Sequence, residues 1–170
     1  LIDKPVGWTS FDVVAKIRGQ LKKQSGSKVK VGHSGTLDPF ATGLLVILIG
    51  QATKKAQEYT KLDKVYEVEM NLGYTSTTGD PEGKLTKIST QIPSQKIVEQ
   101  TLMSFVGEIE QIPPKFSAIK VGGKRAYELA RAGKEVKIGP RKVLIHSISN
   151  IKCDYPKVLF TCHVSSGTYV

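Results

Sequence analysis

The chain has 170 residues, and its 25 lysines and arginines against 15 aspartates and glutamates give a formal net charge of +10. This length suits one domain that buries roughly two thirds of its unfolded surface without disulfides. The positive charge favours a polyanionic partner, nucleic acid above all. Because no apolar run approaches the roughly 20 residues of a membrane-spanning helix, we expect a cytoplasmic protein with no membrane partner.

The two cysteines, Cys153 and Cys162, lack the CxxC spacing of a metal site, and only His146 and His163 lie near them in sequence. We therefore expect no bound metal. Both thiols are interpreted as packing groups of a protein from a reducing compartment.

The first third of the chain predicts alternating short strands and helices. Residues 1–3 have the pattern of a strand, and Thr9 or Ser10 is the expected cap of the helix that follows. That helix has one apolar stripe, formed by Phe11, Val14, Ile17 and Leu21. The continuous apolar run at 44–50 predicts a buried strand, and residues 52–60 predict a short helix.

The rest of the chain predicts a sheet with helices packed on it. Residues 65–72 alternate as a half-buried strand, with Tyr66, Val68, Met70 and Leu72 on one face. A long turn-rich loop covers 73–84. A helix is expected from the cap Ser94 to the stop Gly107, with Ile97, Thr101, Leu102 and Phe105 facing inward. Residues 143–152 and 158–164 predict a hairpin. The irregular order of elements favours an α+β fold with a mixed, largely antiparallel sheet flanked by helices and loops.

Asp38 is the single carboxylate of the stretch 31–45, "VGHSGTLDPFATGLL". Asp-Pro is a favoured helix opening, with the aspartate as cap and the proline at the first helical position. Gly43 and the β-rich run that follows leave little room for a helix, so we favour a loop. Asp38 and Thr42 also share the D-x-x-x-T spacing of Mg²⁺-dependent phosphoaspartyl enzymes, but Phe40 stands where a second metal-binding acid is needed.

Five segments together resemble one family. The longest is "GHSGTLDPFATGLL", and the others are "LIDKPVGWTSFDVV", "KVYEVEMNLGYTSTTGDPEG", "PPKFSAIKVGGKRAYELARAG" and "CHVSSGTYV". They cover nearly the whole chain in one order and spacing. By these motifs the chain resembles the TruB family of pseudouridine synthases.

The resemblance implies the pseudouridine synthase fold and the isomerisation of a T-loop uridine of tRNA, at position 55, to pseudouridine. The departing base is also the incoming nucleophile, so the reaction needs no cofactor, no metal and no second substrate. One ionised carboxylate beside the sugar can suffice. In family terms Asp38 is that carboxylate, and both covalent attack on the nucleoside and removal of a ribose proton remain open.

The resemblance also assigns roles around an extruded nucleotide. His33 would fill the place of the flipped base, the alternative being that it satisfies the backbone of its own loop. Tyr66 would stack on the uracil and help to move the C5 proton, the alternative being core packing. Tyr169 matches a catalytic-site tyrosine that precedes, by two positions, an arginine paired with the aspartate. That arginine would follow Val170, so the resemblance implies that 1–170 is a catalytic domain truncated before its C-terminal part, lacking a C-terminal RNA-binding module and poorly active alone.

Two further sets of residues follow from the motifs and the charge pattern. The segment 113–142 is interpreted as a basic, thumb-like, mobile insertion that contacts phosphates. The expected RNA-binding residues are His33, Ser34, Thr36, Lys115, Lys120, Arg125, Arg131 and Arg141. The expected structural support of the site consists of Lys4, Pro5, Gly35, Leu37, Pro39 and Asp80, although Asp80 has the alternative role of organising a turn.

The expected partner is the T-stem-loop of tRNA, bound by a monomer. Two alternatives come from the same resemblance: a tRNA-binding folding chaperone whose catalysis is incidental, and a relative that works with a guide RNA. The long thumb-like insertion favours the stand-alone enzyme over the guide-RNA relative.

Overall fold

The computed structural model describes residues 1–170, which divide into two compact units, Leu1–Leu62 and Asp63–Val170. Each unit is described by itself. No helix in the chain is long and apolar enough to cross a membrane.

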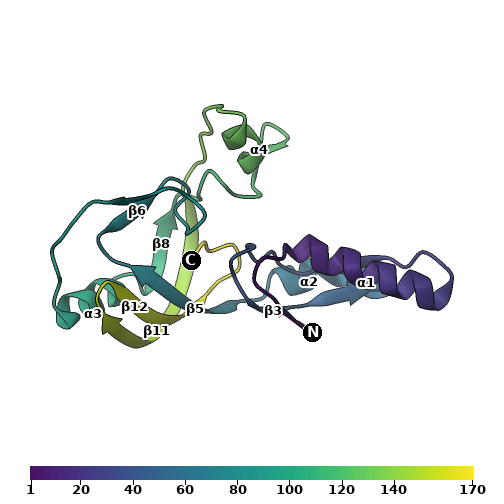
Figure 1. The fold of residues 1–170 in the computed structure, drawn as a ribbon, viewed down its shortest axis with the longest axis horizontal. Coiled ribbons are helices and arrows are strands. Elements are labelled where there is room, and N and C mark those ends of the chain that lie inside the picture. Colours follow the sequence, from purple (N-terminus) through teal and green to yellow (C-terminus); the bar gives the residue numbers. More distant parts are fainter. The chain divides into compact units, whose positions relative to one another are not determined.

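The first unit is built on one long helix and two small antiparallel ladders (Figure 1). Its elements are β1 (Ile2–Lys4), α1 (Ser10–Ser25), β2 (Val31–His33), β3 (Gly43–Leu45), β4 (Ile47–Ile49), the 3₁₀ helix η1 (Gly50–Lys55) and α2 (Ala56–Thr60). Strand β1 pairs with β3, and β2 pairs with β4. The predicted opening strand and the predicted first helix are confirmed, and the helix predicted at 52–60 is the 3₁₀ helix η1 followed by α2. The predicted apolar stripe of the first helix is partly wrong, because Phe11 is 61% exposed and Val13 is buried beside Val14.

A capping box fixes the start of α1. The Asp12 N–H donates to Thr9 Oγ1 at 3.0 Å, while the Thr9 hydroxyl and N–H donate to Asp12 Oδ2 at 2.6 and 2.8 Å. These bonds, the hydroxyl one first, lower the pKa of the Asp12 carboxyl. The helix ends at Gly26, whose φ of 69° is a left-handed conformation that glycine adopts without strain.

The prediction of one buried strand at 44–50 is wrong. The run contains two strands, β3 and β4, which pair with different partners. Only Leu45 and Leu48 are buried, whereas Leu44 is 66% and Ile49 is 44% exposed. Apolar composition alone does not distinguish one strand buried on both faces from two short strands joined by a bend.

The second unit is organised around a four-stranded antiparallel sheet in the order β5-β12-β11-β8 (Figure 1). These strands are β5 (Lys64–Asn71), β8 (Gly107–Gln111), β11 (Arg141–Asp154) and β12 (Lys157–Val164). The β11–β12 pair is the predicted hairpin, and β5 shows the predicted alternation of half-buried and exposed residues. The expected α+β class with a largely antiparallel sheet is confirmed.

The core of this unit lies between the sheet and α3 (Gln95–Met103). It contains seven buried residues: Val98, Leu102, Ile145, Ile148, Val158, Cys162 and Val164. Ser94 caps α3 as predicted, its hydroxyl accepting from the Ile97 N–H at 3.4 Å. The predicted inward face is partly wrong, because Ile97, Thr101 and Phe105 are exposed and the buried residues of α3 are Val98 and Leu102. The predicted stop at Gly107 is also wrong, because α3 ends at Met103 and Gly107 begins β8.

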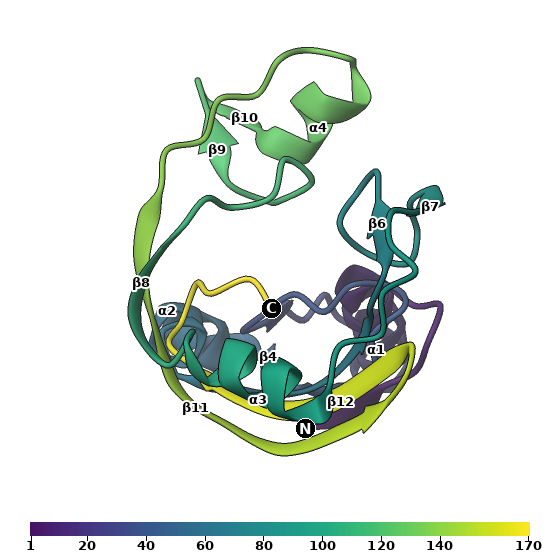
Figure 2. The same cartoon turned by 90° about the vertical axis from the view of Figure 1, so that its left-hand side faces the viewer.

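Two short hairpins lie between the main strands. The predicted loop at 73–84 in fact opens with β6 (Tyr74–Ser76), which pairs with β7 (Leu85–Lys87). The segment between β8 and β11 contains β9 (Lys120–Val121), β10 (Lys124–Arg125) and α4 (Ala126–Arg131). Figure 2 shows this segment standing away from the four-stranded sheet.

Candidate active site and nucleic-acid interface

Asp38 lies in the loop between β2 and β3 and is exposed. Its carbonyl accepts from the Ala41 N–H at 3.1 Å, which closes a turn, and no helix follows. The favoured loop interpretation is therefore confirmed, and the helix-cap interpretation is wrong.

The residue before Asp38 is held by the first residue of α1. Ser10 Oγ accepts from the Leu37 N–H at 2.9 Å and donates to the Leu37 carbonyl at 3.2 Å. Ser10 is only 2% exposed. Sequence reasoning considered Ser10 only as a helix cap, and nothing in the local pattern reveals a contact between residues 27 positions apart.

The residue after Asp38 is held by a buried lysine. Lys4 is fully buried, and its ammonium donates to the carbonyls of Trp8 at 2.7 Å, Pro5 at 3.0 Å and Pro39 at 3.4 Å. The Gly7 N–H also donates to the Pro39 carbonyl, at 2.7 Å. A buried ammonium has three donors to satisfy, and here three carbonyls satisfy them. The backbone on both sides of Asp38 is thus fixed by hydrogen bonds.

His33 ends β2 and turns back on its own loop. Its Nδ1 lies 2.6 Å from the Gly35 carbonyl, and since a carbonyl can only accept, Nδ1 carries the proton in this arrangement. This bond agrees with the alternative role of His33, which is to satisfy a backbone carbonyl of its own loop. Only Nδ1 takes part in it, and Nε2 does not. Ser34 is 7% exposed, which disfavours an RNA contact by its hydroxyl, whereas Thr36 is exposed.

Tyr66 and Tyr169 belong to the second unit. Tyr66 lies in β5 opposite Cys162 and packs, half-buried, against the core. Tyr169 is held through its backbone, because its N–H donates to Gln111 Oε1 at 2.9 Å and its carbonyl accepts from Gln111 Nε2 at 2.6 Å. Gln111 was missed by sequence reasoning, since no spacing rule connects positions 58 residues apart.

Asp80 organises a turn. Its Oδ1 accepts from the Thr78 hydroxyl at 2.6 Å and from the Glu82 N–H at 3.0 Å. This is the Asx-type arrangement that the turn-rich sequence allows. The structure gives Asp80 the role named above as the alternative.

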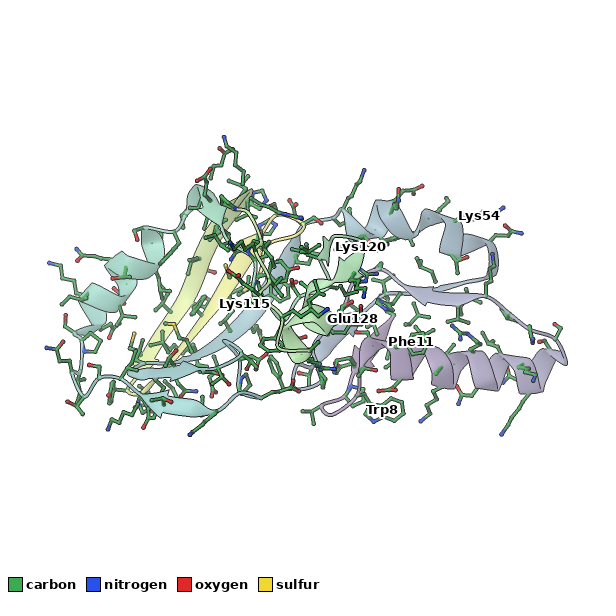
Figure 3. All side chains as sticks on the ribbon, turned by 90° about the horizontal axis from the view of Figure 1, so that it is seen from above. Trp8, Phe11, Lys54, Lys115, Lys120 and Glu128 are labelled. Atoms are coloured by element: carbon green, nitrogen blue, oxygen red, sulfur yellow. The ribbon has the colours of Figure 1, made fainter.

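The basic segment between β8 and β11 presents its cations to solvent. Lys115 and Lys120, which are labelled in Figure 3, are both exposed. Arg125 donates to the Ala118 carbonyl, and the Arg131 guanidinium lies 5.6 Å from the centre of the Tyr127 ring. The exposed cations of the segment are Lys115, Lys120, Lys124, Arg125, Arg131, Lys134 and Lys137, and the exposed Arg141 follows as the first residue of β11.

A second basic surface, in the first unit, was not singled out from the sequence. A hollow of about 450 Å³ lies between the C-terminal half of α1 and the strand that follows it, lined by Arg18, Lys22, Lys28, Val29, Lys30 and Val31. Arg18 is anchored there by donating to the Val31 carbonyl at 3.2 Å. The sequence signal is the i, i+4 spacing of Arg18 and Lys22 on the helix. Four cations around one hollow suit an anion such as phosphate.

The comparisons with known proteins agree in one family. Residues 22–170 match the family described as TruB family pseudouridylate synthase (N terminal domain). The chain is 43% identical over 170 residues to tRNA pseudouridine synthase B of Bacteroides fragilis, covering 99% of this chain and 73% of that protein. It is 46% identical over 169 residues to the protein of that name from Clostridium kluyveri, covering 99% of this chain and 57% of that one. The chain therefore belongs to the TruB family of pseudouridylate synthases.

Solved structures agree on the fold. A chain in the crystal structure of a Cbf5–Nop10–Gar1 complex matches with a TM-score of 0.69 and 31% identity over 99% of this chain and 39% of that one. A chain in the structure of an H/ACA RNP bound to a substrate RNA containing 2′-deoxyuridine matches with a TM-score of 0.63 and 28% identity over 98% of this chain and 37% of that one. The expected pseudouridine synthase fold is confirmed.

Proposed function

We propose that this chain is the catalytic part of an enzyme that isomerises a T-loop uridine of tRNA to pseudouridine, with Asp38 as the essential carboxylate. One observation carries the proposal: an exposed aspartate stands in a loop whose flanking residues, Leu37 and Pro39, are held by Ser10 and Lys4. Fixed backbone on both sides suits a carboxylate that must meet a reacting atom accurately. Family membership supplies the reaction.

The isomerisation conserves every atom of the nucleotide. The N1–C1′ bond breaks, the uracil turns, C5 bonds to C1′, and the proton leaving C5 is balanced by one added at N1. Two routes suit a carboxylate: attack on C1′ to form an ester that is later displaced, or removal of the C2′ proton to give a glycal that is later reprotonated. Deuterium at C2′ distinguishes them, because only the second route breaks that C–H bond.

The other roles belong to the same proposal. Tyr66 stacks on the extruded uracil, a contact worth roughly 1–3 kcal/mol per stacked base. Its hydroxyl helps to move the C5 proton. His33 fills the space that the base leaves, with Nδ1 bonded to the Gly35 carbonyl and Nε2 outside that contact. Tyr169 takes the place of the family's catalytic-site tyrosine. Support for these roles comes from the motif matches and from the anchored positions of His33 and Tyr169.

RNA binding is assigned to the two basic surfaces, the segment 113–142 and the hollow beside α1. Their exposed cations suit phosphate contacts that position the T-stem-loop without reading bases. We expect a monomer that works in the cytoplasm, because tRNA is the proposed substrate. Identities of 43% and 46% to tRNA pseudouridine synthase B, against 31% to the Cbf5-complex chain, favour the stand-alone enzyme over a guide-RNA relative.

The test is the Asp38→Asn substitution, with Asp154→Asn as a matched control on an exposed strand position. A T-stem-loop RNA is incubated with each protein, and pseudouridine is mapped with carbodiimide. We expect Asp38→Asn to lose activity at least about a hundredfold while it still binds the RNA. Normal isomerisation by Asp38→Asn contradicts the proposal, and loss of binding together with catalysis contradicts the assignment of Asp38 to chemistry.

A further inference from the structure

Three potential metal ligands meet at one end of the four-stranded sheet. Asp63 directly precedes β5, His146 lies in β11 and His163 lies in β12. One ligand atom from each side chain lies within 4.8 Å of the other two. The Nε2 of His146 is 2.9 Å from the Asp63 Oδ2, and the two imidazole centres are 4.5 Å apart with a 32° tilt. The expectation of no bound metal rested on the spacing of the cysteines and histidines, which does not include Asp63.

A β-bulge explains why the two histidines face each other. Ile145 pairs with Val164 and Ser147 pairs with His163, so β11 contains one extra residue at this point, His146. In a regular ladder, side chains one position apart point to opposite faces. A bulge places two residues opposite one and re-aims a side chain, which brings His146 to His163.

The third ligand comes from the neighbouring strand of the same sheet. Lys64 pairs with Val164 and Val65 pairs with His163, so Asp63 sits just beyond the end of this ladder. β11, β12 and the residue just before β5 therefore each contribute one ligand at the same end of the β5–β12 ladder. Side-chain exposures of 31% for His146 and 47% for Asp63 leave the group accessible to ions from solvent.

The contact between His146 and Asp63 alone does not account for the group. A half-exposed pair of this kind contributes little to stability, and it involves only one of the two imidazoles. The two rings face each other at 4.5 Å, and a divalent ion that takes one nitrogen lone pair from each ring and an oxygen of the carboxylate would engage all three side chains.

We propose that Asp63, His146 and His163 bind one divalent transition-metal ion of the Zn²⁺ class. Two imidazole nitrogens and one carboxylate oxygen are a ligand set that Zn²⁺ accepts, with water in the fourth tetrahedral position. Metal–ligand distances of about 2.0–2.1 Å place tetrahedral ligand atoms roughly 3.3 Å apart. The present separations are at most 4.8 Å, and rotation of the exposed Asp63 and His146 side chains can shorten them to that value.

The ion would act as a clamp on β5, not as a participant in isomerisation. It ties the residue before β5 to both strands of the β11–β12 hairpin. Tyr66 lies three residues after Asp63 and pairs with Cys162, the neighbour of His163. Binding therefore stabilises the end of the sheet that bears Tyr66, and it is testable without any RNA.

The test uses the full chain, freed of metal with EDTA and then titrated with Co²⁺, a spectroscopic substitute for Zn²⁺. We expect one equivalent to bind with visible absorption bands of four-coordinate Co²⁺, and Zn²⁺ to displace it. Asp63→Asn, His146→Gln and His163→Gln should each weaken binding at least about tenfold, and the double histidine variant should abolish it. His33→Gln, which removes the remaining histidine, and Cys153→Ser, which removes a thiol of the same sheet, are matched controls for binding and should leave the spectrum unchanged.

A second measurement separates loss of ligands from loss of fold. Circular dichroism of the metal-free variants should match that of the parent chain. Zn²⁺ at a hundredfold excess over its Kd should raise the Tm of the parent by roughly 5 °C or more and leave the double histidine variant unchanged. The proposal is overturned if the parent binds no Co²⁺, if the double histidine variant binds it equally well, or if Asp63→Asn binds with unaltered affinity, which would indicate an adventitious histidine pair only.

Discussion

The Ser10 hydroxyl bonds to both backbone groups of Leu37, accepting from its N–H at 2.9 Å and donating to its carbonyl at 3.2 Å. Leu37 is the residue before Asp38, and Ser10 is the buried first residue of α1. The helix is itself fixed at this end by the capping box of Thr9 and Asp12. The loop that carries the candidate carboxylate is thus attached to a rigid element through one side chain.

Ser10→Ala should destabilise the chain by about 1–3 kcal/mol, because the Leu37 N–H loses its partner. If Asp38 has the proposed role, kcat should fall more than substrate affinity, since the carboxylate keeps its charge but loses its fixed position. Denaturant unfolding and steady-state kinetics measure the two effects. Ser25→Ala, at the other end of the same helix, is the control and should change stability by less. Equal behaviour of the two variants would mean that the Ser10 contact does not hold the loop.

Lys4→Met tests the second attachment of the loop. Methionine has a similar length but cannot donate to the carbonyls of Trp8, Pro5 and Pro39, and the substitution removes bonds to a charged group in a buried site. We expect a loss of roughly 1.5–3 kcal/mol in the free energy of unfolding. Lys23→Met, at an exposed position of α1, should be close to neutral. An unchanged midpoint of denaturation for Lys4→Met would show that its apolar stem, not its ammonium, matters.

Local sequence patterns predicted those elements in which the spacing of apolar residues follows from burying one face. The alternation of β5, the hairpin of β11 and β12, and the Ser94 cap of α3 all follow from side chains a few positions apart. These elements are readable because each depends on short-range geometry. The motif segments also predicted the family, which is confirmed, and singled out Asp38 as the candidate carboxylate.

What failed depends on contacts between distant residues. The run at 44–50 was uniformly apolar, so nothing in it marked the bend between two ladders with different partners. The extra residue at His146 is a property of the pairing with His163 and not of β11 alone. Nothing in the sequence near Gln111 marks it as the partner of Tyr169, because only the fold brings the two residues together.

Gln111→Glu should loosen the C-terminal segment at Tyr169. The carboxylate can still accept from the Tyr169 N–H, but it cannot donate to the Tyr169 carbonyl and faces it with negative charge. We expect faster hydrogen exchange at Tyr169 and a loss of about 1–3 kcal/mol, the cost of an unsatisfied acceptor. Gln91→Glu, at an exposed position, introduces the same charge without this contact. Unaltered exchange at Tyr169 would contradict the expected anchoring role.

Neutralising the hollow beside α1 tests whether it binds phosphate. In the double variant Lys28→Gln, Lys30→Gln, two of its four cations lose their charge while Arg18 keeps its bond to Val31. RNA affinity should fall similarly for all sequences, and the slope of log K against log salt should decrease by about 0.7–0.9 for each phosphate that the variant no longer neutralises. Lys61→Gln with Lys152→Gln removes equal charge elsewhere and is the control. An equal loss of RNA affinity in both double variants, with unchanged salt slopes, would indicate that only the net charge of the protein matters.

The two cysteines should differ in their reactivity toward iodoacetamide. Cys162 is 3% exposed in the core of the second unit, and burial raises the pKa of its thiol, whereas Cys153 is only partly buried. Because the thiolate is the nucleophile, a raised pKa leaves less of it at pH 8, and packing blocks what remains. Cys153 should therefore be alkylated first in the native chain, and Cys162 should react at a similar rate only after unfolding in urea. Peptide mass analysis over time measures both rates. Early labelling of Cys162 would mean that the β12 face opens in the native state. Repeating the reaction at higher pH separates the two causes, because a pKa effect alone disappears as the pH is raised and a packing effect does not.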